Sequence, residues 1–366
     1  MKKIVFGILV LVLAVGFFVG KGKPGTPIKA TLSDSTTKDK MSDPSYAKAS
    51  AGKQDDTQKK FLFVPYWGQT AERIPDSYGN SLVYFGVAPG KDGIDTTDDG
   101  YVGLARFAAI AKGRKTFLTV RMTNSDNALA ILKDEKEEQK IIDQTIAVAK
   151  QYGFSGVVLD LEVSGLPFNA TTTKMDSFVK QFSESSKKES MSFSMMFFGD
   201  TFYHFRSYDI VALRDYLDFA FVMAYDLHKA NGDPGPNFPL SGKETYGYDF
   251  TVMTNDFLNV LPKEKLVMVF GMFGYDWKVD ADGKSLEQAQ AIPLTLAKKK
   301  FLEECSLKSC VVKRDEKAAE TNVSYVDEKG YKHVVWFEDE ESVSAKQKFL
   351  KEKGITNVGF WAYSYY

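Results

Sequence analysis

Residues 153–162 have the sequence Gly153-Phe154-Ser155-Gly156-Val157-Val158-Leu159-Asp160-Leu161-Glu162, an apolar run that ends in two carboxylates one residue apart. The Val and Leu residues predict a buried strand, and side chains on a strand alternate between its faces, so Val158, Asp160 and Glu162 share one face. Burying carboxylates beside such a run costs free energy unless they are paired with another group or have a function. In parallel barrels the catalytic groups lie at the C-terminal ends of the strands. The stretch therefore predicts a barrel strand that carries catalytic acids.

Seven further apolar runs alternate with amphipathic segments. Together with the first run they predict eight strands, at residues 61–66, 81–87, 116–121, 156–161, 192–198, 219–224, 266–270 and 357–361. Helices are expected between them at 100–112, 127–152, 173–188, 208–216, 251–261 and 342–353. Eight short strands with intervening helices predict an α/β fold, the TIM (β/α)8 barrel, over residues 61–366. An open doubly wound sheet is the alternative, but the Gly-x-Gly-x-x-Gly turn typical of that fold does not follow the first run.

The interval between the seventh and eighth runs is longer than a crossover needs. Inside it, residues 321–326 and 331–337 alternate like strands around Asp327-Glu328-Lys329-Gly330, which is a hairpin turn signal. We expect a small α+β insertion between strands seven and eight, at about residues 278–340.

The N-terminal region differs from the rest of the chain. Lysines flank an uncharged apolar run that ends at Gly20, so residues 1–20 predict a membrane anchor or a signal peptide. No clear cleavage site follows, which favours the anchor. Residues 21–60 are polar and poor in large apolar side chains, which predicts a flexible linker. The expected location is therefore extracytoplasmic, with the protein anchored to the cell membrane, or secreted if the segment is cleaved.

Charge and cysteine content limit the possible partners. The 366 residues carry 47 Lys and Arg against 48 Asp and Glu, a formal net charge of −1, so no electrostatic bias points to nucleic acid. Cys305 and Cys310 are the two cysteines, and they lack the further ligands of a zinc site. In an exported domain they form either a local disulfide or two separate thiols.

Several stretches resemble glycoside hydrolase family 18, the chitinases and related N-acetylglucosaminidases. Asp160 and Glu162 occupy the last two acidic positions of the family signature Asp-Gly-x-Asp-x-Asp-x-Glu, while Ser155 and Val158 replace its first two acids. Residues 221–226, Phe-Val-Met-Ala-Tyr-Asp, resemble the family's sixth-strand motif. A further resemblance is to the subgroup related to bacterial spore-germination and cortex-lytic hydrolases, at residues 227–236, 266–277, 333–339 and 342–348. Residues 359–361 resemble the family's last strand. These matches follow the family's order.

The resemblance implies a site without a metal or an organic cofactor. Glu162 would be the general acid, and the substrate's own acetamide oxygen would attack the anomeric carbon. Asp160 would orient the acetamide, Tyr225 would hydrogen-bond its oxygen, and Trp361 would lie under the sugar ring. Tyr66, Asp226, Met223 and Tyr275 are further candidates for substrate binding, although ordinary core packing explains Tyr66 and Tyr275 as well.

The implied function is a glycoside hydrolase acting on β-linked polymers that contain N-acetylglucosamine, in peptidoglycan or chitin. The alternative is a weak or inactive chitinase-like protein that only binds carbohydrate. Val158 cannot hydrogen-bond Asp160 as a polar residue at that position would. We therefore expect a raised pKa at Asp160 and weakened catalysis or a displaced pH optimum.

Overall fold

The computed structural model describes residues 59–366 except 70–71, 76, 78 and 164–168. The expected anchor or signal peptide at 1–20 lies outside the described residues, as does the expected linker at 21–60 up to residue 58. No helix within the described ranges is both long and apolar enough to cross a membrane.

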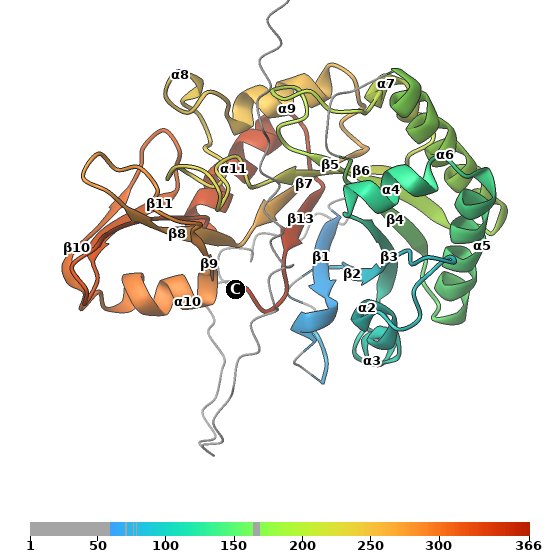
Figure 1. The fold of residues 1–366 in the computed structure, drawn as a ribbon, viewed down its shortest axis with the longest axis horizontal. Coiled ribbons are helices and arrows are strands. Elements are labelled where there is room, and N and C mark those ends of the chain that lie inside the picture. Colours follow the sequence, from blue (N-terminus) through green and yellow to red (C-terminus); the bar gives the residue numbers. More distant parts are fainter. Residues whose placement is uncertain (1–58, 70–71, 76, 78, 164–168) are drawn as a thin grey trace, which may run out of the picture. The chain divides into compact units, whose positions relative to one another are not determined.

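Eight parallel strands close into a barrel (Figure 1), which confirms the predicted fold class. Around the barrel the order is β1-β13-β7-β6-β5-β4-β3-β2. The bounds are Lys60–Pro65 for β1, Ser81–Val87 for β2, Lys115–Met122 for β3, Gly156–Leu161 for β4, Ser192–Phe198 for β5, Phe219–Ala224 for β6, Leu266–Gly271 for β7 and Val358–Trp361 for β13.

Each barrel strand is buried on both faces, because helices cover the outside and side chains fill the inside. On β4, Val157, Leu159 and Leu161 belong to the outer core under the helices. Val158 belongs to the barrel interior. The interior is rich in aromatic rings that meet edge to face, with Phe61 against both Phe117 and Phe221. The alternation therefore directs the even-numbered side chains of β4 into the barrel, as the sequence predicts.

Helices lie on the outside of the barrel (Figure 1). Their bounds are Asp99–Val102 for α2, Leu104–Ile110 for α3, Ser125–Ile131 for α4, Glu135–Gln151 for α5, Asn169–Lys188 for α6, Ile210–Leu213 for α7, Lys243–Tyr246 for α8, Phe250–Leu258 for α9 and Glu340–Glu352 for α11, and a 3-10 turn, η1, spans Tyr66–Gly68.

Three expected helices are shorter or broken. The helix expected at 100–112 is divided at Gly103 into α2 and α3. The helix expected at 127–152 is divided into α4 and α5, because the Asp134 side chain accepts hydrogen bonds from the backbone N–H groups of Lys136 and Glu137 and starts a new helix. The helix expected at 208–216 is reduced to α7, which Asp209 caps through the N–H of Ala212.

A second sheet follows β7, with five antiparallel strands in the order β10-β11-β12-β8-β9. The bounds are Phe273–Val279 for β8, Gln290–Pro293 for β9, Lys308–Arg314 for β10, Thr321–Val326 for β11 and Lys332–Phe337 for β12, with α10 at Leu294–Ala297 and η3 at Lys298–Glu303. The predicted hairpin corresponds to β11 and β12. Cys305, which precedes β10, forms a disulfide with Cys310 of β10, so the disulfide alternative is the one observed.

Candidate active site

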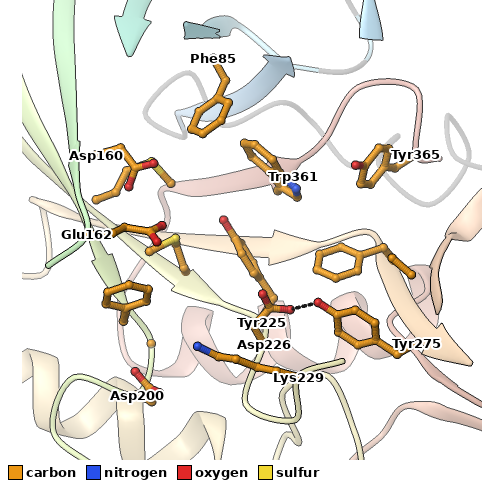
Figure 2. A pocket seen from close by; sticks show the side chains of 16 residues that line it. Phe85, Asp160, Glu162, Asp200, Tyr225, Asp226, Lys229, Tyr275, Trp361 and Tyr365 are labelled. Atoms are coloured by element: carbon orange, nitrogen blue, oxygen red, sulfur yellow. Dashed lines mark hydrogen bonds between the residues drawn. The ribbon is translucent and has the colours of Figure 1, made fainter. Parts of the chain in front are cut away.

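A cavity of about 340 Å³ opens at the C-terminal ends of the barrel strands (Figure 2). It brings together residues from β2, β4, β5, β6, β8 and β13 and from the loops that follow them. Its lining includes Phe85, Asp160, Glu162, Phe198, Asp200, Met223, Tyr225, Asp226, Lys229, Phe273, Tyr275, Trp361 and Tyr365. This is the end of a parallel barrel at which active sites form.

Asp160 lies near the end of β4 and is only 2% exposed. Its Oδ1 atom is buried and has no hydrogen-bond partner among the described residues. Burial raises the pKa of Asp160 well above its usual range, and the neighbouring Glu162 raises it further. Arg121 of β3 pairs with Asp160 of β4 in the strand register, and its positive charge acts against this rise in pKa. The Arg121 guanidinium donates its hydrogen bonds to Asp98 and to the carbonyl of Gly86. The predicted rise in the pKa of Asp160 is confirmed.

Val158 is fully buried beneath Asp160, between two small polar residues. In the registers of the strands it pairs with Thr119 of β3 and with Ser194 of β5. Both hydroxyl groups are buried, and neither has a hydrogen-bond partner among the described residues. Polar atoms thus surround a position whose own side chain can neither donate nor accept a hydrogen bond.

Glu162 follows β4, and its carboxyl points into the cavity (Figure 2). Burial raises the pKa of Glu162, and the Asp226 carboxylate acts in the same direction. Lys229 and Arg206 lower the pKa of Glu162. A carboxyl with a raised pKa remains protonated closer to neutral pH, which suits a general acid.

Tyr225 and Trp361 line the cavity with nearly parallel rings, whose centroids are 6.4 Å apart at an angle of 28°. Tyr225 directly follows β6, and burial raises its pKa well above its usual range, so it is a neutral hydroxyl donor. Gly271 allows Tyr225 this place, because a Cβ at Gly271 would lie 2.7 Å from the Cβ of Tyr225. Phe85 packs edge-on against Trp361 with centroids 4.7 Å apart.

Asp226 has a left-handed backbone with φ of 61°, which is uncommon for a residue other than glycine. Two contacts hold it there. The Tyr275 hydroxyl donates to Asp226 Oδ1 at 2.8 Å, and the Asp226 N–H donates to Asn237 Oδ1 at 2.8 Å. Burial raises the pKa of Asp226, and the hydrogen bond from Tyr275 acts against that rise.

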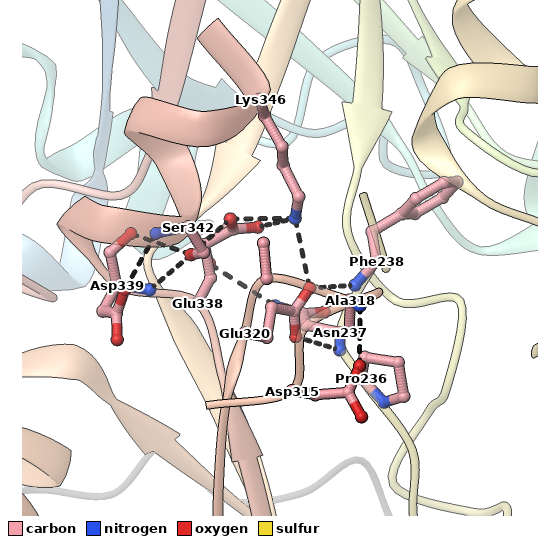
Figure 3. Close-up of polar contacts among 12 residues, drawn as sticks. Pro236, Asn237, Phe238, Asp315, Ala318, Glu320, Glu338, Asp339, Ser342 and Lys346 are labelled. Atoms are coloured by element: carbon pink, nitrogen blue, oxygen red, sulfur yellow. Dashed lines mark hydrogen bonds and ion pairs between the residues drawn. The ribbon is translucent and has the colours of Figure 1, made fainter. Parts of the chain in front are cut away.

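A buried ionic cluster contacts the loop after β6 (Figure 3). The Glu320 carboxylate accepts the N–H groups of Asn237 at 2.6 Å and Phe238 at 2.8 Å. Lys346 of α11 donates to Glu320 at 3.1 Å and to Glu338 at 2.7 Å, and all three side chains of this ionic cluster are fully buried. Burial raises the pKa of Glu338 to about 8. The ionic cluster joins α11, the second sheet and the loop after β6, and so fixes the backbone that carries Asp226.

Seven of the eight candidate residues line one cavity: Asp160, Glu162, Met223, Tyr225, Asp226, Tyr275 and Trp361. Tyr66 is not among the lining residues. It lies in η1, where its ring stacks on the guanidinium of Arg121 at 4.8 Å and meets Trp67 edge to face. Its position there depends on the turn after β1, which no local pattern indicated.

Sequence reasoning did not select several of the lining residues, notably Phe198, Asp200 and Lys229. Phe198 ends β5 and Asp200 follows it, so a search of every strand end would have found these two. Lys229 lies in the long loop after β6, where no periodic pattern applies. Among the described residues, no group of three or more His, Cys, Asp or Glu side chains is arranged to hold a metal ion.

Comparison with known proteins gives a consistent family match. Residues 59–365 match the family described as glycosyl hydrolases family 18. The cortical fragment-lytic enzyme of Bacillus anthracis is 25% identical over 315 residues, covering 80% of this chain and 66% of that protein. The chain thus spans slightly less than two thirds of the length of this curated relative.

Solved structures share the fold. The spore cortex-lytic enzyme SleL of Bacillus cereus superposes with a TM-score of 0.66 at 21% identity, covering 84% of this chain and 71% of that one. The class V chitinase of Nicotiana tobaccum superposes with a TM-score of 0.73 at 15% identity, covering 84% of this chain and 95% of that one.

Proposed function

Because the chain belongs to glycosyl hydrolase family 18, we propose that it hydrolyses β-linked polymers containing N-acetylglucosamine by a substrate-assisted, retaining mechanism. The observation that carries the proposal is the convergence of Asp160, Glu162, Tyr225 and Trp361 on one cavity at the C-terminal end of the barrel.

Glu162 is the proposed general acid. Burial favours its protonated form, and its position in the cavity gives it access to a glycosidic oxygen. As the C1–O bond breaks, the proton of Glu162 passes to the departing oxygen. The acetamide oxygen of the same sugar forms a new bond to C1, which gives a cyclic oxazolinium ion.

Asp160 and Tyr225 are the proposed partners of the acetamide. The unpartnered Oδ1 of Asp160 is an acceptor for the acetamide N–H, and the ionised carboxylate stabilises the positive oxazolinium. The raised pKa of Asp160 opposes its ionisation until this positive charge develops beside it. The Tyr225 hydroxyl donates to the acetamide oxygen and holds it in place for attack. A nucleophile that is already part of the bound substrate gains through proximity.

Trp361 is the proposed floor beneath the sugar, with Met223 beside it and with Asp226 and Tyr275 at the edge of the cavity. In the second step water attacks C1, and the carboxylate of Glu162 takes up the proton of that water. The C1–O bond to the acetamide breaks, so the product has the β-configuration of the substrate and Glu162 is protonated again.

Incubation of the full chain with N-acetylglucosamine oligomers and with purified peptidoglycan tests the proposal. We expect new reducing ends, identified by mass spectrometry. Activity should be lost in Glu162→Gln and retained in Glu184→Gln, which changes an exposed glutamate of α6. If the wild type and Glu162→Gln bind oligomers equally and neither releases reducing ends, the protein is a carbohydrate-binding member of the family and the proposed activity is wrong.

The proposed place of action is outside the cytoplasmic membrane, with the apolar segment 1–20 as anchor or signal peptide. This proposal rests on the sequence of the N-terminal region alone. Cell fractionation and N-terminal sequencing of the native protein test it, and recovery from the cytosol would contradict it.

A further inference from the structure

A second cavity of about 490 Å³ adjoins the proposed active site. It lies between the segment after β5 and the loop after β6, and it shares Asp200 and Lys229 with the first cavity. Its other lining residues are His204, Arg206, Leu227, His228, Gly232 and Asp233. Substrate bound in the first cavity can therefore extend directly into the second.

The acids of this second cavity are already paired. Asp200 is buried and accepts hydrogen bonds from Arg206 and, at 3.0 Å, pairs with Nδ1 of His204. Asp233 pairs with Lys284 at 2.8 Å. The second cavity therefore has no uncompensated negative charge from these two carboxylates.

Lys229 is the cation that remains. It is exposed, and it forms no ion pair with the residues that the structure describes. Its ammonium group lies 5.5 Å from the centroid of the Phe198 ring, and the guanidinium of Arg206 lies 4.2 Å from the same centroid. Two positive charges thus border one aromatic ring at the junction of the two cavities.

Glu162 lies at the side of the cavity, at a level between Trp361 and the pair Asp200 and Lys229 (Figure 2). If Glu162 protonates the oxygen that joins two sugars, the sugar over Trp361 lies on one side of it. The leaving sugar then lies on the other side, toward Asp200 and Lys229. Lys229 also lowers the pKa of Glu162, which indicates that the two groups are close.

We infer that Lys229 recognises a free carboxylate on the leaving sugar, as on the lactyl group of an N-acetylmuramic acid residue that carries no stem peptide. This inference rests on the proposed function and specifies its substrate class. Chitin carries no such carboxylate, and in intact peptidoglycan the lactyl carboxyl is an amide with the stem peptide. A cationic subsite at this position therefore favours glycan strands from which the stem peptides have been removed, with N-acetylglucosamine over Trp361 and N-acetylmuramic acid beyond Glu162.

Equilibrium binding to the Glu162→Gln variant tests the inference without turnover. The two ligands are an alternating N-acetylglucosamine–N-acetylmuramic acid tetrasaccharide with free lactyl carboxylates and the same tetrasaccharide with each carboxylate converted to a neutral methyl amide. We expect roughly tenfold tighter binding of the carboxylate form, typical of a hydrogen bond to a charged group. The preference should weaken at high salt.

Lys229→Met, added to Glu162→Gln, should abolish the preference between the two ligands. Lys313→Met should retain it, because Lys313 is an exposed residue of the edge strand β10. An equal loss of affinity for both ligands in Lys229→Met would overturn the inference, because Lys229 would then act on a part of the sugar that both ligands share.

The failure of this inference is distinguishable from failure of the proposed function. Hydrolysis of the tetrasaccharide by the wild type without a carboxylate preference would support the proposed activity and refute the carboxylate subsite. A carboxylate preference in binding without hydrolysis by the wild type would support the subsite and refute the activity. Where both hold, the new reducing end should be N-acetylglucosamine.

Discussion

Replacing Val158 by Asn should restore a hydrogen-bond partner to Asp160. The Val158 side chain points into the barrel interior beneath Asp160, and the buried hydroxyls of Thr119 and Ser194 flank it without partners of their own. An amide at this position can donate to Asp160 and also bond one of the two hydroxyls.

The size of the effect follows from the burial of Asp160. A hydrogen bond to a charged group contributes about 1.5–3 kcal/mol. Since one pKa unit corresponds to about 1.4 kcal/mol, the pKa of Asp160 should fall by about 1–2 units. The donated hydrogen bond favours the ionised form, so the shift is toward lower pH.

The assay is the pH profile of kcat/KM on a soluble N-acetylglucosamine oligomer. Asp160 must be ionised and Glu162 protonated for the proposed mechanism, and the two titrate as a pair. The acidic limb of the profile should therefore move to lower pH by about 1–2 units in Val158→Asn, with a higher plateau. The control is Val158→Ala, which removes the same methyl groups without adding a polar atom.

An acidic limb that is the same in Val158→Asn, Val158→Ala and the wild type would refute this reasoning. Thermal unfolding of each variant shows whether the barrel is intact, so a lost fold is not mistaken for lost catalysis.

Two further changes probe the support of the site. Lys346→Met should destabilise the protein by ~3–5 kcal/mol in urea unfolding, because it leaves Glu320 and Glu338 buried without their counter-charge. Burial raises the pKa of Glu338 to about 8. Protonated Glu338 therefore stabilises the fold at acidic pH, and this stabilisation is lost as the pH rises through about 8. If Lys346→Met loses no more stability at alkaline pH than at acidic pH, the pairing of Lys346 with ionised Glu338 is contradicted. Tyr275→Phe removes the hydrogen bond to Asp226 and should lower kcat/KM by roughly tenfold. It should also lower the stability by about 1–3 kcal/mol, because a partly buried acceptor loses its donor. Unchanged kinetics would show that this bond does not position the loop.

The barrel strands were predictable because parallel strands covered on both faces form continuous apolar runs. The runs at 81–87, 156–161, 192–198 and 219–224 have the same bounds as β2, β4, β5 and β6. Helix breaks were not predictable from apolar periodicity, because the pattern continues through them. At Asp134 a local side-chain cap ends one helix and begins the next.

The site was predictable where its residues end a strand and carry a recognisable motif. Asp160, Tyr225 and Trp361 lie at such positions, and all three line the cavity. Tyr66, the last residue of the first predicted strand, was also placed in the site, but a short 3-10 turn directs its ring to Arg121. Lys229 was missed because its place depends on the path of a long loop over the second cavity.

In the proposed mechanism the acetamide oxygen of the substrate, and no protein group, forms the bond to C1. The measurement that tests it most directly is kcat/KM for a set of otherwise identical oligomers in which the acetyl group carries none, one, two or three fluorine atoms. Fluorine withdraws electrons from the carbonyl oxygen, so the account predicts that kcat/KM falls with each fluorine added. A rate that does not depend on fluorination would show that some other group attacks C1 and would contradict the account.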